Sequence, residues 1–104
     1  MTMYHGTTKD NYKIIQKTNI LNAPVFLTPE KRIAVEYAAN NAADFVIIEV
    51  EVDETLFQAD REFVSGLSED WLKESLGNGS VYIDSEMGIE SAKITVFQDY
   101  EEVE

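Results

Sequence analysis

The chain has 104 residues, of which 44% are hydrophobic, and it fits one globular domain over residues 1–104. Its 20 acidic and 8 basic side chains give a formal net charge of −12, which disfavours binding to free nucleic acid or to anionic lipid. The absence of cysteine excludes disulfides, thiolate metal sites and a cysteine nucleophile, and no apolar run reaches membrane-spanning length.

The first part of the chain predicts two strand-helix units. A short strand at residues 3–5 ends at Gly6-Thr7-Thr8, and Thr7 or Thr8 caps a helix over residues 9–18. Residues 19–24 form a loop. Residues 25–27 form a second strand, followed by a helix over residues 29–41 with Thr28 as N-cap and Pro29 as its first residue.

The next segment contains the clearest strand, residues 45–52, whose successive side chains point to alternate faces. One face is apolar, and the other begins apolar and ends acidic. Residues 53–66 are irregular, with a short strand near residues 62–64. Ser68 then caps a helix that turns Trp71, Leu72 and Leu76 inward and stops at Gly77-Asn78-Gly79.

The last segment predicts a strand at residues 80–83, a polar loop at 84–91, and a strand at 93–98. Residues 100–104 contain three glutamates and read as a loose acidic tail. The sum is an α+β domain of about five or six short strands and three helices, without the alternation of a doubly wound parallel sheet.

Three groups of residues could carry chemistry. The first is Tyr4-His5-Gly6-Thr7, which holds the only histidine, at a strand end beside a glycine that admits close approach to the backbone. The alternative is a surface histidine near the chain terminus.

The second group joins Phe26 and Thr28 to Ala34 and Tyr37. A helix start offers unpaired N–H groups, and two aromatic rings, from the strand and from the helix, can enclose a planar ligand. The alternative is a core strand packed on an amphipathic helix.

The third group is acidic: Asp84, Glu86 and Glu90 follow the strand at residues 80–83. A carboxylate there can orient a ribose hydroxyl or stabilise a developing cation, and the alternative is a solvated loop. One histidine and scattered carboxylates do not have the spacing of metal ligands, so no metal site is expected.

In this order the three groups resemble the ADP-ribosyltransferase superfamily, in its His–Tyr–acidic branch of diphtheria-toxin-like and poly-ADP-ribose-polymerase-like enzymes. Tyr4-His5-Gly6-Thr7 is similar to the first motif of that branch. Phe26-Leu27-Thr28-Pro29 with Ala34 and Tyr37 is similar to the second, with the two aromatic residues 11 positions apart.

Two positions depart from the family pattern. The first aromatic of the pair is usually Tyr and here is Phe26, and the late strand begins with Lys93 where the family often has Glu. Some small members, including a phage anti-CRISPR type, carry the acid at the end of the preceding strand. That location ranks Asp84 first, Glu86 second and Glu90 third.

The resemblance implies a small ADP-ribosyltransferase-like fold with a split sheet, NAD as co-substrate, and mono-ADP-ribosyl transfer to a macromolecular target. His5 would hold the nicotinamide ribose, the Gly6 backbone would bind the carboxamide, and Phe26 and Tyr37 would stack the ring. Tyr4, Thr7 and Thr28 would line the same site, and Asp84 or Glu86 would stabilise the cation that forms as the glycosidic bond breaks.

The expected target is a basic protein surface or a protein–nucleic-acid assembly in the cytoplasm, such as a host defence protein on which a phage factor acts. One alternative is a catalytically inactive acidic module that keeps the fold and inhibits a basic partner. Another is RNA 2′-phosphotransferase chemistry, which needs several basic residues, whereas the only arginines are Arg32 and Arg61.

Overall fold

The structure is a computed structural model that describes residues 1–64 and 70–103, and in this part the chain forms three α-helices and nine β-strands. The helices are α1 (Lys9–Gln16), α2 (Lys31–Asn41) and α3 (Trp71–Gly77). The strands are β1 (Thr2–Thr8), β2 (Ile20–Leu21), β3 (Val25–Leu27), β4 (Phe45–Glu51), β5 (Gln58–Ala59), β6 (Val81–Ile83), β7 (Met87–Gly88), β8 (Lys93–Gln98) and β9 (Glu101–Val103). Two 3₁₀ turns cover Glu54–Leu56 and Arg61–Phe63. The α+β class predicted from the sequence is confirmed, with more short strands than expected.

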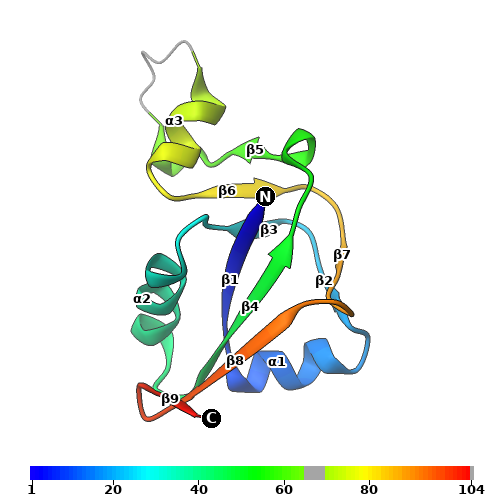
Figure 1. The fold of residues 1–104 in the computed structure, drawn as a ribbon, viewed down its shortest axis with the longest axis vertical. Helices are drawn as coiled ribbons and strands as arrows, with labels where there is room; N and C mark the ends of the chain where they lie inside the picture. The colour runs from blue at the N-terminus through cyan, green and yellow to red at the C-terminus, as the bar shows by residue number, and fades with distance from the viewer. Residues whose placement is uncertain (65–69, 104) are drawn as a thin grey trace.

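The strands form three antiparallel sheets, in the orders β1-β4-β8-β9, β3-β6-β5 and β2-β7. In Figure 1, β3, β6 and β5 run across the direction of β1 and β4. One backbone bridge ties the two larger sheets together. The Tyr4 amide donates to the Thr28 carbonyl at 2.8 Å, and the Thr28 amide donates to the Tyr4 carbonyl at 3.0 Å.

Strand β4 is buried on both faces because the four-stranded sheet lies between two apolar layers. Val46, Ile48 and Val50 join the larger core, which also takes in α1, β3 and β6. Phe45 and Ile47 face α2. The acidic end of β4 emerges toward solvent, where Glu49 lies opposite Lys93 of β8 at 3.9 Å. The predicted pattern of this strand is therefore confirmed.

Helix α2 lies alongside β1 (Figure 1), and Gly6 sets their separation. A Cβ atom at position 6 would lie 2.7 Å from the Ala34 carbonyl oxygen and 3.1 Å from the Ala38 Cβ. The small residues Ala34 and Ala38, both buried, meet the glycine from the helix side. A side chain at position 6 would thus push the helix off the sheet.

Two predicted boundaries near β1 are wrong. Strand β1 continues through Gly6, Thr7 and Thr8, because each of these residues pairs with β4. Helix α2 begins at Lys31 with Glu30 as its N-cap, and Glu30 makes no side-chain cap bond. Thr28 cannot cap the helix because its backbone is held by Tyr4, and its hydroxyl instead accepts the Glu30 N–H at 3.2 Å.

The acidic tail is also not loose where the structure describes it. Residues 101–103 form β9 against β8, and Asp99 and Tyr100 make the two-residue turn between them. Both turn residues have positive φ, 51° and 66°, as the tight hairpin turn with matching twist requires. The sequence does not predict this turn, because Asp-Tyr is not a typical pair of residues for it.

Other irregular segments contain structure that the sequence does not signal. The loop at residues 19–24 holds β2, and the loop at 84–91 holds β7, its partner. Residues 62–64, predicted as a strand, belong largely to the 3₁₀ turn over Arg61–Phe63. Two-residue strands carry no detectable alternation, so only the tertiary pairing defines them.

Helix α3 is shorter than predicted and presents a different face. Ser68, predicted as its cap, lies outside the described residues, and the Asp70 side chain accepts the Lys73 N–H at 3.0 Å as the observed N-cap. Trp71 and Leu72 are exposed, at 42% and 37%, so their predicted inward orientation is wrong. Leu76 packs against the larger core as predicted, and Ser75 is fully buried. The helix ends at Gly77, as predicted. None of the helices that the structure describes is long and apolar enough to cross a membrane.

We expect Gly6→Ala to lower the free energy of unfolding by about 1–3 kcal/mol, because the added methyl must displace the α2 backbone. Chemical denaturation measures the effect. Gly77→Ala is the matched control: a Cβ there meets nothing within 4 Å, so stability should stay equal or rise slightly. Equal stability of the Gly6→Ala variant and the unmodified chain would contradict this packing.

Candidate functional site

A cleft of about 730 Å³ opens between β1, the end of β3 and α2, and we name it the aromatic cleft. Its size is that of a small-molecule site. All seven residues that the sequence motifs nominate for cofactor binding line it: Tyr4, His5, Gly6, Thr7, Phe26, Thr28 and Tyr37. The Tyr4–Thr28 bridge brings the two motifs together, although they are more than 20 residues apart in the chain.

His5 is half-buried in β1, and its Nδ1 lies 2.8 Å from the Phe26 carbonyl oxygen. A carbonyl oxygen only accepts, so Nδ1 carries the proton. Burial lowers the pKa of His5 below its ordinary value, and the Phe26 hydrogen bond offsets part of this effect. The ring is therefore neutral at pH 7, and its Nε2 is a hydrogen-bond acceptor.

Two aromatic side chains of the cleft, Phe26 and Tyr37, are exposed. In β3, Val25 and Leu27 point into the core, so Phe26 points the other way, and it is 48% exposed. The Phe26 ring packs against Tyr82 of β6, with ring centroids 5.6 Å apart and planes tilted by 45°. Tyr37 of α2 is 66% exposed, whereas Ala34 and Ala38 on the same helix are buried. Neither ring belongs to the core, so the alternative of a simple strand–helix packing does not account for them.

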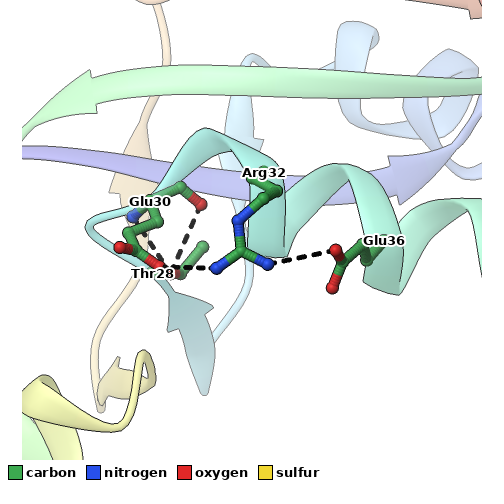
Figure 2. Close-up of polar contacts among 4 residues, drawn as sticks. All are labelled: Thr28, Glu30, Arg32 and Glu36. Atoms are coloured by element: carbon green, nitrogen blue, oxygen red, sulfur yellow. Dashed lines mark hydrogen bonds and ion pairs between the residues drawn. The ribbon is translucent and has the colours of Figure 1, made fainter.

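The smaller residues of the cleft hold its walls. Gly6 is required by the approach of α2, a structural reason that the sequence does not reveal. The buried Thr7 hydroxyl accepts the side-chain N–H of Asn11 at 2.8 Å and so ties β1 to α1. Thr28 closes the turn before α2, as Figure 2 shows.

The structure does not bring Asp84 into the aromatic cleft. Ser80 lines this cleft at one end of β6, and Asp84 follows the other end, about 13 Å away at the strand rise of about 3.3 Å per residue. Asp84 and Glu90 are exposed and line neither this cleft nor the one described next.

Glu86 lines a second cleft of about 470 Å³ beside α1, which we name the α1 cleft. His5 and Asn11 line both clefts, so the two clefts adjoin at these residues. Of the acids nominated from the sequence, Glu86 is thus the one that shares a cleft with the histidine.

Two carboxylates that the motifs do not nominate, Asp60 and Glu62, line the aromatic cleft. Asp60 is buried and occupied: its Oδ1 accepts the Glu62 N–H at 3.1 Å, and its Oδ2 accepts the Ser80 hydroxyl at 2.8 Å. The hydroxyl of the fully buried Ser75 accepts the Asp60 N–H at 2.8 Å and donates to the Ser80 carbonyl. Asp60 therefore holds the turn, and the exposed Glu62 is the carboxylate left to face a ligand.

No sequence signal identifies Glu62, because it lies in a segment without periodicity. The cap geometry of Asp60 two residues earlier is the only local indication that a turn begins there.

The described lining of the aromatic cleft contains no Lys or Arg. Arg32 is near in sequence, but its side chain is 68% exposed and lies between two glutamates (Figure 2). Its Nη1 donates to Glu36 at 3.1 Å and its Nη2 to Glu30 at 3.3 Å. The cleft is therefore aromatic and acidic in character.

Comparisons of the chain with protein-family models, curated proteins and solved structures found no match. Function is therefore inferred from the side chains of the two clefts.

We expect the imidazole of His5 to titrate below its ordinary pKa of about 6.5, with Nδ1 protonated in the neutral form. Because the folded pKa is lowered, the unfolded chain takes up the proton first. The contribution of His5 to stability is then constant well above about pH 6.5 and falls as the pH drops through this value toward the folded pKa. NMR titration of this single histidine gives both the midpoint and the tautomer.

His5→Asn is the control, since its amide can still donate to the Phe26 carbonyl but has nothing to protonate. Its unfolding free energy should change less than that of the unmodified chain between about pH 7.5 and 5.5. Parallel changes in the two proteins, or a midpoint at or above 6.5, would contradict the assignment.

Proposed function

We propose that the chain binds NAD in the aromatic cleft and transfers its ADP-ribosyl group to a protein target. One observation carries the proposal: two exposed aromatic rings, Phe26 and Tyr37, share a cleft with a neutral histidine whose Nε2 accepts hydrogen bonds. An aromatic pair suits a planar heterocycle, and an acceptor beside it suits a sugar hydroxyl. The resemblance of both motifs to the ADP-ribosyltransferase superfamily supports the same ligand.

In this proposal each residue has a separate task. Phe26, held by Tyr82, and the Tyr37 ring flank the nicotinamide. His5 Nε2 accepts a hydroxyl of the adjoining ribose, which the Phe26 hydrogen bond makes possible by fixing the ring. Glu62 is the carboxylate in the described lining that is exposed and not used to hold a turn, so it is placed to stabilise positive charge on the ribose.

The reaction breaks the bond between the ribose carbon and the nicotinamide nitrogen, and the bonding pair leaves with neutral nicotinamide. A nucleophilic atom of the target supplies the pair for the new bond to that carbon and loses its proton to a carboxylate or to water. NAD would supply the activated sugar, and this chain would supply orientation and the negative charge.

The residues present fit the nicotinamide–ribose half of NAD better than its diphosphate. Phosphate groups are usually held by Lys, Arg or helix N-termini. The described lining has no Lys or Arg, and Arg32 is paired with Glu30 and Glu36. This observation favours a second candidate: an acidic module that keeps the cleft without catalysis and inhibits a basic partner.

The charge of the chain favours a protein target over free nucleic acid. At −12 the surface repels phosphate backbones, whereas a basic protein surface is attracted and meets it faster. A protein–nucleic-acid assembly fits as well if it is approached through its protein surface.

NAD should raise the melting temperature, by mass action on the native state, and nicotinamide alone should raise it weakly.

Tyr37→Ala should weaken NAD binding about tenfold, in line with about 1–3 kcal/mol for stacking of a base on an aromatic ring. Because Tyr37 is exposed, the free energy of unfolding should change by no more than about 0.5 kcal/mol. Tyr100→Ala, which removes an equally exposed tyrosine outside the cleft, should leave binding unchanged. Calorimetry that detects no NAD at millimolar concentration would remove the cofactor proposal.

Release of nicotinamide from NAD distinguishes the enzyme from the inactive module and identifies the acid. Glu62→Gln should lower the rate by about 10²-fold or more with little change in NAD affinity, because charge that develops only in the transition state affects the rate first. If Asp84→Asn lowers the rate of nicotinamide release more than Glu62→Gln does, Asp84 is the catalytic acid, as the family motif implies. No release by the unmodified chain, with NAD bound, would support the inactive module.

A further inference from the structure

The α1 cleft shares His5 and Asn11 with the aromatic cleft, and the rest of its described lining differs. One wall comes from α1, through Asn11 and Ile14, and the other from residues 20–24. Glu86, from the segment between β6 and β7, completes it. Its volume of about 470 Å³ is that of a site for a small molecule or for one or two side chains.

Charge in this cleft has one sign. Glu86 is the only Asp, Glu, Lys or Arg in the described lining, and His5 is neutral at pH 7. Within the described part of the chain no hydrogen bond or ion pair joins Glu86 to another residue. An exposed, unpaired carboxylate in a concave site attracts a cation, and the net charge of −12 adds to this attraction.

The rest of the lining suits a long cationic side chain. Ile14 is 63% exposed, and Pro24, also exposed, belongs to the same lining. These apolar surfaces can cover the aliphatic stem of a Lys or Arg while its charged end meets a carboxylate. Asn11 and Asn22 add side-chain amide oxygens, which a guanidinium with five donors can use better than an ammonium group.

We propose that the α1 cleft docks an arginine side chain of the protein target, with its guanidinium on Glu86 and its stem along Ile14. The docked residue would lie next to His5 and hence beside the ligand of the aromatic cleft. The proposal rests on the proposed function only in calling the partner a target, since docking itself needs no NAD.

The test is a titration of the chain, without NAD, with a short peptide that contains one arginine and has capped, uncharged termini. NMR follows the His5 imidazole and the amides of α1. Binding should perturb these resonances, and a peptide with citrulline, the neutral isostere of arginine, should bind at least about threefold more weakly. A lysine peptide should bind between the two.

Glu86→Gln should weaken binding of the arginine peptide to the level measured for the citrulline peptide. Glu102→Gln, which removes one charge from an exposed position on β9, is the matched control and should bind as the unmodified chain does. If the two substitutions weaken binding of the arginine peptide equally, the effect comes from net charge alone and the proposed site is wrong. Equal binding of arginine and citrulline peptides would overturn it without any variant.

The two proposals fail separately. Glu86-dependent binding of arginine in a chain that does not bind NAD would keep the α1 cleft and remove the proposed function. Binding of NAD without any perturbation of α1 by the arginine peptide would overturn the docking site alone.

Discussion

The pair of backbone hydrogen bonds between Tyr4 and Thr28 is the constraint on which the site depends. It joins β1 to the segment that leads from β3 into α2 and so ties two sheets that share no other strand pairing within residues 1–64 and 70–103. Because β3 is fixed beside β1, the Phe26 carbonyl meets His5 Nδ1, and the Phe26 ring is turned away from the core. The same bridge prevents Thr28 from capping α2, and the helix starts later than its sequence suggests.

Close packing of α2 gives the second wall of the aromatic cleft. Gly6, Ala34 and Ala38 let the helix approach β1, and Tyr37 then projects from the helix into the cleft while remaining exposed. Exposed aromatic rings contribute little to folding, and at a concave surface they would suit the ligand proposed above. The hydrogen-bond network of the buried Asp60 and Ser75 with the half-buried Ser80 supplies the third wall and positions Glu62.

The electrostatics divide the site into two unlike parts around one neutral imidazole. The aromatic cleft offers stacking surfaces and carboxylates without a cation, and the α1 cleft offers one unpaired carboxylate among apolar and amide groups. A ligand that places developing positive charge beside Glu62, and a partner that brings a fixed positive charge to Glu86, would suit these two environments. In both clefts the acidic character follows the composition of the whole chain.

The sequence alone determined what local patterns can encode: the α+β class, the buried strand at residues 45–52 with its acidic end, the stop at Gly77-Asn78-Gly79, and the two motifs whose residues line one cleft. These features depend on alternation, helical spacing and turn residues within a few positions of one another. The tertiary structure alone decided the extension of β1 through Thr8, the late start of α2, the short strands β2 and β7, and the β9 hairpin. It also separated Asp84 from the cleft and brought Asp60 and Glu62 into it. The β9 hairpin is local but has an atypical turn sequence, and the other features depend on partners distant in the chain, which residue types at neighbouring positions do not specify.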